Sequence, residues 1–470
     1  MIEVSKNRLW NLCLFSSACL LLLWAALLNG YPLLYSDSGT YIASGHIDYV
    51  PVDRPIIYGL FVRHLSLSWR LWLVVLLQAV FVNYIFYLLI KFFVGLKKTF
   101  FWIFLISLCL TVFTGISYFV SQLTADIFAS VTVLTIFLIY SIPKKEKIHL
   151  IFLVILLGFS IISHLSHLPL ALALILFLGA FELLRKKKRM ERKNRILLLL
   201  LTLVSAVLIL SLTNFLYGAS ARLSRASNVV VGARLIETGI ANKHLKRVCD
   251  QEEELPYAEL CDYIDQFDRW PAAGYYLHDT KSPLYAGDCL EKDWTNCWLE
   301  KDSTYQALIY DILGQEELLK EFILMAITGT ATQFFTYELS LLQPIDFDYL
   351  IEQHYPAEKY LFEHSNQYKN TLHFEVLSFR QMVFIYISFL LLFYFLWKKR
   401  NKISWRAKLL VAFVLLALLL NAFICATFSN VVPRYQARLI FLLPLAVIMI
   451  GLELAKQYNR KKSINLKEWF

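Results

Sequence analysis

The chain has 470 residues, of which 58% are hydrophobic and only 17% are charged. This apolar fraction excludes an ordinary soluble domain and predicts an all-α polytopic membrane protein. The net charge of +10 does not indicate a nucleic-acid surface, because the Lys and Arg residues form short clusters between apolar runs, a distribution that orients membrane helices. We therefore expect membrane lipids as partners, and no nucleic acid.

Ten apolar runs are candidate transmembrane helices, since about 20 apolar residues are needed to cross the hydrocarbon core of a bilayer. The first run follows Lys6 and Arg8, and no small-residue cleavage site comes after it. We therefore expect a retained helix and not a removed signal peptide. The ten runs cover residues 9–29, 71–92, 99–118, 124–142, 148–164, 168–184, 195–214, 380–397, 407–428 and 437–455.

Basic clusters between the runs predict the orientation. They lie at residues 97–98, 144–147, 185–195, 398–402 and 456–462. All of them share one side of the membrane if the N-terminus is on that side too, so the positive-inside rule places both termini in the cytoplasm. We expect a bacterial inner membrane. An endomembrane is the alternative, because the lumen of an endomembrane compartment is topologically equivalent to the extracytoplasmic side.

One long segment, residues 215–379, separates the seventh apolar run from the eighth, and it is acidic and rich in Tyr. It divides the chain into an N-terminal transmembrane module (1–214), a mainly helical extracytoplasmic cap (215–379), and a C-terminal transmembrane module with a cytoplasmic tail (380–470). Within the cap, residues 315–342 show helical periodicity. A second helix is expected over 303–313, because Ser303 and Gln306 have the spacing of a capping box.

Four of the eight cysteines lie in the cap segment, and an oxidising compartment would allow them to form two disulfides. Neighbouring positions favour Cys249–Cys261 and Cys289–Cys297. The two other pairings, and reduced buried thiols, stay open as alternatives.

Two acidic residues stand at the outer ends of apolar runs. Asp37 follows the first run within Ser36-Asp37-Ser38-Gly39, which is also good turn and helix-capping chemistry. Asp126 begins the fourth run, where a carboxylate usually faces a wet cavity or a charged partner. A favourable interaction with the helix dipole is its structural alternative.

Polar side chains also mark the other outer turns. Gln122 lies just before Asp126, and His164 and His167 stand three residues apart in the next turn. Two histidines without a third clustered ligand are a weak metal signal, so we interpret them as polar residues of a tight turn.

Arg434 and Arg438 are spaced i, i+4 at the outer start of the last run, so they share one helix face. The helix dipole opposes positive charge at this end, and an anionic partner is therefore expected. A phosphate suits both the guanidinium fork and the helix terminus. Snorkelling to lipid headgroups is the alternative. With Arg54 from the first loop, these turns would suit an enzyme acting on a lipid-linked phosphate ester.

At these residues the chain resembles the GT-C class of integral-membrane glycosyltransferases. The resemblance covers roughly residues 1–215 and 380–455, and the cap matches no domain of that family. The residues that carry it are Asp37 with its neighbours from Ser36 to Tyr41, Arg54-Pro55, Tyr58-Gly59, Ala125-Asp126, Pro433-Arg434-Tyr435 and Pro444.

The resemblance implies a polyprenyl-phosphate-linked sugar donor, an acceptor that is a glycan, lipid or protein, and inversion at the anomeric carbon. Asp37 would be the catalytic base, or would orient an acceptor amide, and Asp126 the second acid. The donor phosphate would be bound by Arg434, Arg54, Arg438 and Tyr41. Some members use a divalent cation at such acids and others use none, so the metal requirement stays open.

Three other functions were considered. A transporter or flippase of a lipid-linked sugar would place charges in mid-span, whereas here they gather at the outer mouth. A non-catalytic envelope assembly protein would leave Asp37 dispensable. An acyltransferase would need a His-centred site, for which the turn with His164 and His167 could serve, although no adjacent acid is visible in the sequence.

Overall fold

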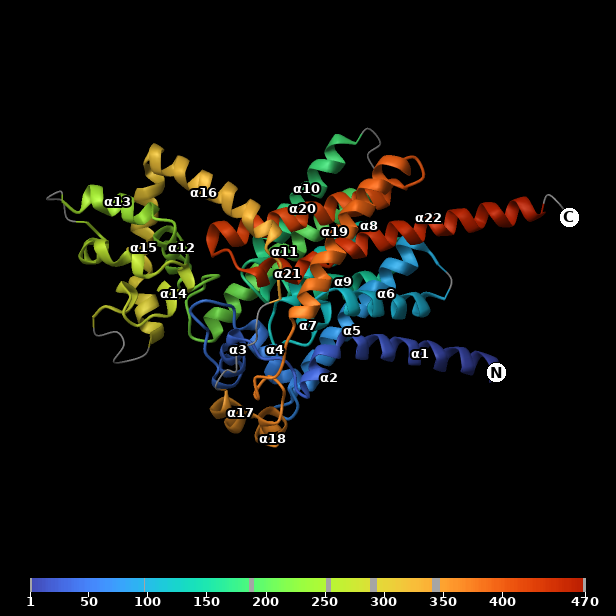
Figure 1. The fold of residues 1–470 in the computed structure, drawn as a ribbon, viewed down its shortest axis with the longest axis horizontal. Helices are drawn as coiled ribbons and strands as arrows, with labels where there is room; N and C mark the ends of the chain where they lie inside the picture. The colour runs from blue at the N-terminus through green and yellow to red at the C-terminus, as the bar shows by residue number, and fades with distance from the viewer. Residues whose placement is uncertain are drawn as a thin grey trace.

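The computed structural model describes residues 2–96, 98–185, 190–250, 255–287, 294–339 and 347–467. The described chain is all-helical and contains no strand, only an isolated parallel bridge between Leu33 and Gln122. Figure 1 shows an elongated molecule, in which a bundle of long helices adjoins a lobe of shorter ones. Helices are expected in such an apolar chain, because each one satisfies its backbone hydrogen bonds internally.

Six helices among the described residues are long and apolar enough to cross a membrane. Two of these spans join consecutive elements: α5 (Trp72–Leu88) continues into the π-helical turn η1 (Leu89–Val94), and α21 (Pro433–Ile440) continues into α22 (Leu442–Lys467). The other four are α10 (His167–Leu184), α11 (Met190–Leu216), α19 (Glu375–Lys398) and α20 (Trp405–Phe428).

The other predicted runs are helical but shorter or interrupted. The first run is divided into α1 (Ile2–Leu22) and α2 (Trp24–Asn29). Three helices of 15 or 16 residues are α6 (Thr99–Phe113), α8 (Ile127–Ser141) and α9 (Lys147–Ile162). At 1.5 Å per residue these three span about 22 to 24 Å, less than the roughly 30 Å of a hydrocarbon core.

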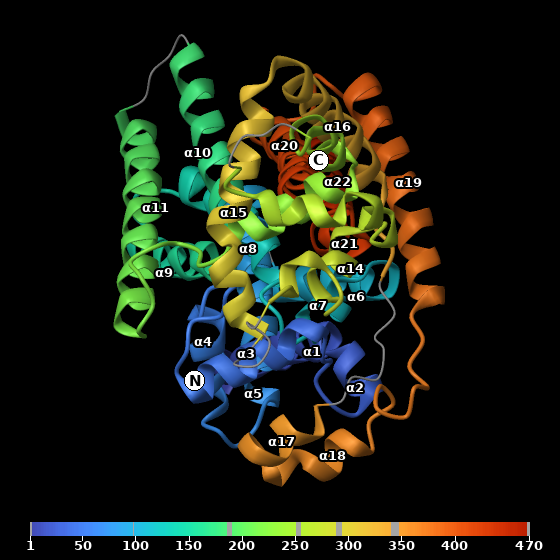
Figure 2. The same ribbon diagram turned by 90° about the vertical axis from the view of Figure 1, so that its left-hand side faces the viewer.

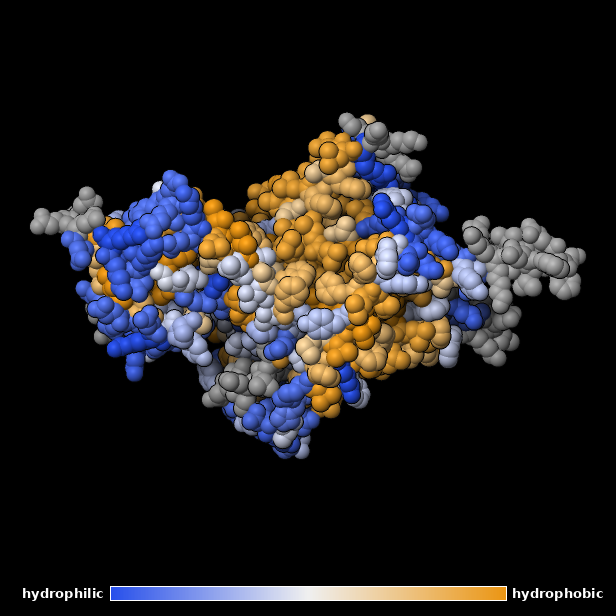
Figure 3. All heavy atoms as spheres, turned by 45° about the horizontal axis from the view of Figure 1, so that its top comes forward, coloured by the Kyte–Doolittle hydropathy of each residue, from blue (hydrophilic) through white to orange (hydrophobic). Residues whose placement is uncertain are grey.

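The degree of burial distinguishes helices at the periphery of the bundle from those in its interior. Less than a third of the apolar window is buried in α11 and in α19, whereas 14 of the 15 residues of α8 are buried. Figure 3 shows an apolar band over the middle of the molecule, with hydrophilic residues concentrated toward the lobe and toward the chain termini. This distribution is that of a bundle whose outer helices face lipid.

The turns that the sequence predicted to lie on the extracytoplasmic side, here called the outer turns, are irregular and are tied together by backbone hydrogen bonds. The turn before α3 (Ser36–Ile47) pairs with the turn that follows α7 (Ile116–Val120). The Leu33 amide donates to Ser121 O at 2.9 Å, and the Leu123 amide donates to Leu33 O at 3.0 Å. This pairing holds the first outer turn against the second, while α4 (Ile57–Ser66) packs on α3.

The segment predicted as a cap contains two parts with different cores. Core residues between Ala226 and Met325, together with Val52, form a cluster separate from the bundle core; we call residues 226–325 the lobe. Figures 1 and 2 show it beside one end of the bundle. Its elements are α12 (Ser227–Glu237), α13 (Ile240–Val248), η2 (Ala258–Arg269), α14 (Ala273–His278), η3 (Pro283–Tyr285), α15 (Trp294–Gly314) and the first half of α16 (Glu316–Phe335).

The second part belongs to the bundle core. Both ribbon views place α17 (Asp348–His354) and α18 (Lys359–Glu363) away from the lobe and near α2 and α3. Between them lies η5 (Pro356–Glu358), where the buried Glu358 carboxylate accepts hydrogen bonds from Tyr31 Oη and from the Leu71 amide, both at 3.1 Å. Hydropathy alone did not indicate this division of the segment.

Two local predictions in the lobe need correction. Ser303 does not begin a helix, because α15 starts nine residues earlier, at Trp294, and buries Trp298 and Tyr305. The predicted helix over 315–342 ends at Phe335, and residues 340–346 lie outside the described chain.

The lobe contains a disulfide between Cys249 and Cys261, which closes the turn between α13 and η2. Cys297 is disulfide-bonded as well, and Cys289, its predicted partner, lies outside the described residues.

Candidate functional site

Asp37 lies in the first turn of α3, where the local sequence shapes the turn around it. Ser38 Oγ accepts a hydrogen bond from the Tyr35 amide at 2.9 Å and donates one to Leu123 O at 2.9 Å. A single hydroxyl therefore caps the helix and ties it to the second outer turn. The neighbouring Asp37 side chain remains available for contacts outside its own helix.

Two arginines from distant parts of the chain meet the Asp37 carboxylate. Arg434 Nη2, in α21, donates to Asp37 Oδ2 at 2.7 Å, and Arg54 Nη1 lies 3.0 Å from Asp37 Oδ1. Arg54 Nε also donates to Asp53 Oδ2 at 3.0 Å. Each carboxylate oxygen of Asp37 thus faces its own guanidinium group.

Asp126 lies at the N-terminus of α8 but does not cap it. Instead, its Oδ1 accepts a hydrogen bond from Arg438 Nη1 at 2.8 Å, and its Oδ2 lies 3.4 Å from Arg434 Nε. Arg438 is fully buried and also donates to Ser166 Oγ at 3.1 Å and Asn421 Oδ1 at 3.3 Å. Arg434 therefore bridges Asp37 and Asp126, the two predicted acids.

These contacts form a continuous series that we call the ion-pair chain: Asp53, Arg54, Asp37, Arg434, Asp126 and Arg438. It contains three carboxylates and three guanidinium groups, so the formal charges balance. Asp126, Arg434 and Arg438 are buried, whereas Asp53, Arg54 and Asp37 are partly exposed. Removing one of the three buried members leaves a charge uncompensated, which costs about 3 to 5 kcal/mol. The series itself is weak evidence for stability, because desolvation of the ions offsets their attraction.

Burial raises the pKa of the Asp37 carboxyl, but the neighbouring Arg434 and Arg54 guanidinium groups lower it more. The resulting pKa lies well below the usual range, so Asp37 is ionised at neutral pH. For Arg54, burial opposes the charged form, but Asp37 and Asp53 outweigh it and raise the pKa of this arginine. Both groups are therefore held as ions.

Arg434 has more hydrogen-bonding capacity than its carboxylate partners use. Its side chain is 7% exposed, yet Nη1 has no hydrogen-bond partner among the residues that the structure describes. The Tyr35 ring lies beside the guanidinium group, 4.1 Å from Cζ to the ring centroid. Buried donors are normally paired, and exceptions cluster where a ligand binds or chemistry occurs.

The two histidines lie beside Arg438. The imidazole rings of His164 and His167 are 5.2 Å apart, and His164 Nδ1 lies 2.9 Å from Ser166 Oγ, which Arg438 contacts. Burial and the Arg438 charge lower the pKa of His164 well below its usual value, so its imidazole is neutral. His167 Nδ1 lies 2.8 Å from the Ser160 carbonyl oxygen.

The remaining predicted residues lie close to the same place. Tyr41 is buried, with Arg54 Cζ 5.2 Å from its ring centroid. Gln122 Oε1 accepts a hydrogen bond from Thr124 Oγ1 at 3.3 Å, and the same hydroxyl lies 3.4 Å from Asp126 Oδ2. The four outer turns thus converge on the ion-pair chain.

The open metal requirement depends on what surrounds the two acids. Asp37 and Asp126 are both paired with guanidinium groups, whose positive charge would oppose a second cation. In the described part of the chain, no group of three or more His, Cys, Asp or Glu side chains is positioned to hold a metal ion.

Three residues of the site were not identified from the sequence. Asp53 ends the ion-pair chain, Tyr35 stacks beside Arg434, and Asn421, buried in α20, accepts from Arg438. Asp53 could have been found as the acidic neighbour of Arg54. Tyr35 and Asn421 carry no such signal, because an aromatic residue near the interface and a lone amide in a helix are common in membrane proteins.

Comparisons of the chain with protein-family models, with curated proteins and with solved structures found no match. Its class therefore follows from the fold and the site alone. The chain is an all-helical membrane protein with a buried, charge-balanced cluster at one end of its bundle.

Proposed function

We propose that this protein is a membrane glycosyltransferase that moves a sugar from a polyprenyl-phosphate donor to an acceptor, with inversion, on the extracytoplasmic face. The observation that carries the proposal is Arg434, a buried guanidinium group with an unused donor between two carboxylates. A phosphate oxygen is the natural acceptor for such a donor, because an ionised pair forms short, strong hydrogen bonds.

The proposal includes a topology in which all ten apolar helices cross the membrane and both termini lie in the cytoplasm. The short α8 is buried among other helices, so its ends need not reach the lipid surface. Irregular backbone at membrane depth is tolerated where it is buried in protein or lines a wet cavity. The buried turn at residues 121–126 meets that condition, so the ion-pair chain would lie slightly below the outer surface.

The donor phosphate would bind Arg434, with Arg54 and Arg438 as neighbouring cations and Tyr41 buried beside Arg54. An incoming phosphate competes with Asp37 for Arg434 Nη2, which now donates to that carboxylate. Exchange of the carboxylate for the phosphate keeps the guanidinium charge compensated throughout. It also frees Asp37 from one of its two partners.

This exchange resolves a difficulty with Asp37 as a base. Its depressed pKa makes it a weak proton acceptor while both arginines are bound to it. Losing Arg434 to the phosphate raises the pKa of the Asp37 carboxyl toward its ordinary value. The base therefore becomes effective only when the donor is bound.

The transfer step then proceeds as a single displacement. The acceptor hydroxyl oxygen attacks the anomeric carbon of the sugar, and its proton passes to the Asp37 carboxylate. The bond from the anomeric carbon to the phosphate oxygen breaks, and the polyprenyl phosphate leaves with the electron pair. Arginines aimed at the leaving group stabilise charge that is larger in the transition state than in the bound donor, which lowers the barrier.

Lipid analysis of the purified protein tests the proposal. The full chain is purified in nanodiscs, and bound lipids are identified by mass spectrometry. We expect a co-purified polyprenyl phosphate in the wild-type protein and its loss in Arg434→Ala. Arg406→Ala is the matched control, because Arg406 is exposed at the opposite end of α20 and should leave the lipid unchanged.

Two results would overturn the proposal. One is the absence of any polyprenyl phosphate from the wild-type protein, which would favour an assembly role. The other is equal retention of the lipid in Arg434→Ala and Arg406→Ala. Transport of a lipid-linked sugar across the bilayer, without transfer of the sugar, would instead support the flippase alternative.

A further inference from the structure

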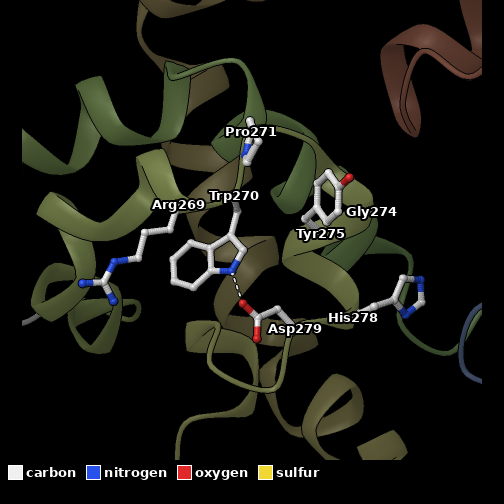
Figure 4. A pocket seen from close by; sticks show the side chains of 7 residues that line it. All are labelled: Arg269, Trp270, Pro271, Gly274, Tyr275, His278 and Asp279. Atoms are coloured by element: carbon white, nitrogen blue, oxygen red, sulfur yellow. Dashed lines mark hydrogen bonds between the residues drawn. The ribbon is translucent and has the colours of Figure 1, made fainter.

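The lobe contains an open surface pocket of about 490 Å³, which includes no residue of the ion-pair chain. It lies where η2 ends and α14 begins, and its volume falls in the range of small-molecule sites, roughly 300 to 1,000 Å³. Figure 4 shows Tyr275 and His278 on one side and Arg269 on the other, with Trp270 and Asp279 between them. The lining residues are Arg269, Trp270, Pro271, Gly274, Tyr275, His278 and Asp279.

The polar groups of this pocket are held in place by the lobe. Trp270 is buried, and its indole Nε1 donates to Asp279 Oδ2 at 2.9 Å, while the Lys281 amide donates to Asp279 Oδ1 at 2.9 Å. These hydrogen bonds, from Lys281 and then Trp270, lower the pKa of Asp279. The carboxylate is therefore ionised and oriented, and each of its oxygens retains capacity for a further donor.

The pocket also presents an aromatic surface to solvent. The Tyr275 side chain is 67% exposed, although it belongs to a short helix whose Tyr276 and Leu277 are buried in the lobe core. An exposed tyrosine on a rigid support provides a flat surface at a low cost in conformational entropy.

The pocket lies near the ion-pair chain. Gly274 lies close to Asn430, because a methyl group built at Gly274 would be 3.9 Å from the side-chain Nδ2 of Asn430. Asn430 is only four residues from Arg434. Burial lowers the pKa of His278, and the charges that also act on it are those of Asp53, Arg54 and Asp37. The site and the pocket thus share one electrostatic environment.

We propose that this pocket binds a saccharide, and that the saccharide is the glycan acceptor of the transfer reaction. The identification of the saccharide as the acceptor rests on the proposed function, whereas the saccharide class rests on the pocket. A pyranose ring offers an apolar C–H face to an aromatic side chain, and its hydroxyls donate to a carboxylate and accept from a guanidinium group.

Other ligand classes fit this lining less well. An anionic ligand would meet the ionised Asp279 carboxylate as well as the Arg269 guanidinium group, so the lining has no excess of positive charge to attract it. A purely apolar ligand would desolvate that carboxylate without giving it a hydrogen-bond donor, a costly arrangement. A neutral, hydroxyl-rich ring satisfies both the aromatic surface and the polar groups.

Saturation-transfer NMR on the full chain in nanodiscs, without any donor lipid, tests the proposal. The probes are soluble di- to hexasaccharides of N-acetylglucosamine, mannose and galactose. We expect at least one series to bind with saturation of its ring C–H protons. Tyr275→Ala and Asp279→Asn should each weaken that binding by at least about tenfold.

Tyr310→Ala is the matched control, because Tyr310 is 68% exposed on α15 of the same lobe but does not line the pocket. Its binding should equal that of the wild-type protein. The proposal is overturned if no series binds, or if Tyr275→Ala and Asp279→Asn bind as well as the control.

The experiment separates this proposal from the proposed function. If the protein binds a saccharide through Tyr275 but retains no polyprenyl phosphate, the saccharide-binding proposal stands and the transferase proposal fails. If the protein retains polyprenyl phosphate but binds no saccharide, the saccharide-binding proposal fails and the transferase proposal stands.

Discussion

Arg434 donates a hydrogen bond to Asp37 at 2.7 Å, although 397 residues separate them in the chain. The contact joins the first turn of α3 to the first turn of α21, so it links the N-terminal part of the chain to its last long helix. Arg434 also approaches Asp126 at the start of α8. One guanidinium group thus sets the relative positions of three outer turns.

The first prediction concerns Asp37→Asn. The amide oxygen still accepts a hydrogen bond from Arg434, so the variant should fold, but it cannot accept the acceptor proton. We expect transfer of sugar to fall by at least about a hundredfold, measured with purified protein and a polyprenyl-linked donor. At neutral pH the variant should still melt cooperatively, but at a lower temperature than the wild-type protein, because Arg434 and Arg54 lose a charged partner.

Asp48→Asn is the control for that prediction. Asp48 ends the same helix in the left-handed conformation that Asn tolerates, and its side chain is half exposed beside Arg63. Its transfer rate should match that of the wild-type protein. Normal turnover in a folded Asp37→Asn variant would contradict the assigned role.

The second prediction concerns Asp126. Substituting Asp126 by Leu leaves the fully buried Arg438 without its carboxylate, so unfolding free energy should fall by about 3 to 5 kcal/mol. Combining Asp126→Leu with Arg438→Met removes the pair together and should recover most of that loss. Denaturant unfolding in detergent measures both. Equal destabilisation by the single and double variants would show that Arg438 is compensated by other groups.

The third prediction follows from the depressed pKa of Asp37. In the unfolded chain this carboxyl has a pKa of about 3.9. As the pH falls, the unfolded state therefore takes up the proton before the folded state does. The stabilising contribution of Asp37 is therefore complete above about pH 5 and is lost as the pH falls toward the folded-state pKa. Melting temperatures of the wild-type protein and Asp37→Asn should differ above about pH 5 and should approach each other progressively as the pH falls below about 4. A constant difference down to pH 2.5 would contradict this.

The fourth prediction concerns the imidazole rings of His46 and His354, whose centroids are 4.4 Å apart where α17 meets α3. Burial lowers the pKa of both, and each is further lowered by a neighbouring positive charge, Arg63 for His46 and His46 for His354. The hydrogen bond to the Ile42 carbonyl oxygen and, more weakly, the Asp48 charge oppose the lowering of the His46 pKa. The packing of α17 against α3 therefore favours neutral imidazole rings. This packing should weaken as the pH falls through about 6.5, where the rings of the unfolded chain gain protons.

Hydrogen exchange measures this effect. Amides of α17 and α18 should exchange faster at pH 5.5 than at pH 7.5, after correction for intrinsic rates. His354→Phe should remove most of this pH dependence, because a phenyl ring cannot be protonated. Unchanged pH dependence in that variant would show that other groups control the docking of α17.

Much of the helical architecture could be predicted from local sequence. Each of the ten apolar runs coincides with helix, because an apolar stretch must satisfy its backbone hydrogen bonds internally. The positions of the polar outer turns follow for the same reason, since they are the gaps between runs. Helix ends were less predictable: the third run, 99–118, is broken at residues 114–115, between α6 and α7.

Predictions from local sequence patterns were wrong where tertiary packing favoured a different structure. The capping-box spacing at Ser303 lies inside α15, because burial of Trp298 and Tyr305 extends that helix in the N-terminal direction. The segment 215–379 contributes to two cores, because Glu358 is hydrogen-bonded by Tyr31 and by the Leu71 amide of the bundle. Contacts across almost 300 residues leave no trace in a local pattern.

The sequence by itself determined where the helices form and which polar residues stand at their outer ends, because hydropathy and charge act over a few neighbouring residues. Only the tertiary structure decided that Asp37 and Asp126 share Arg434, and that Tyr35, Asn421 and Ser166 complete their surroundings. The physical reason is that a buried charge selects its partner by proximity in three dimensions, and packing of the whole bundle sets that proximity.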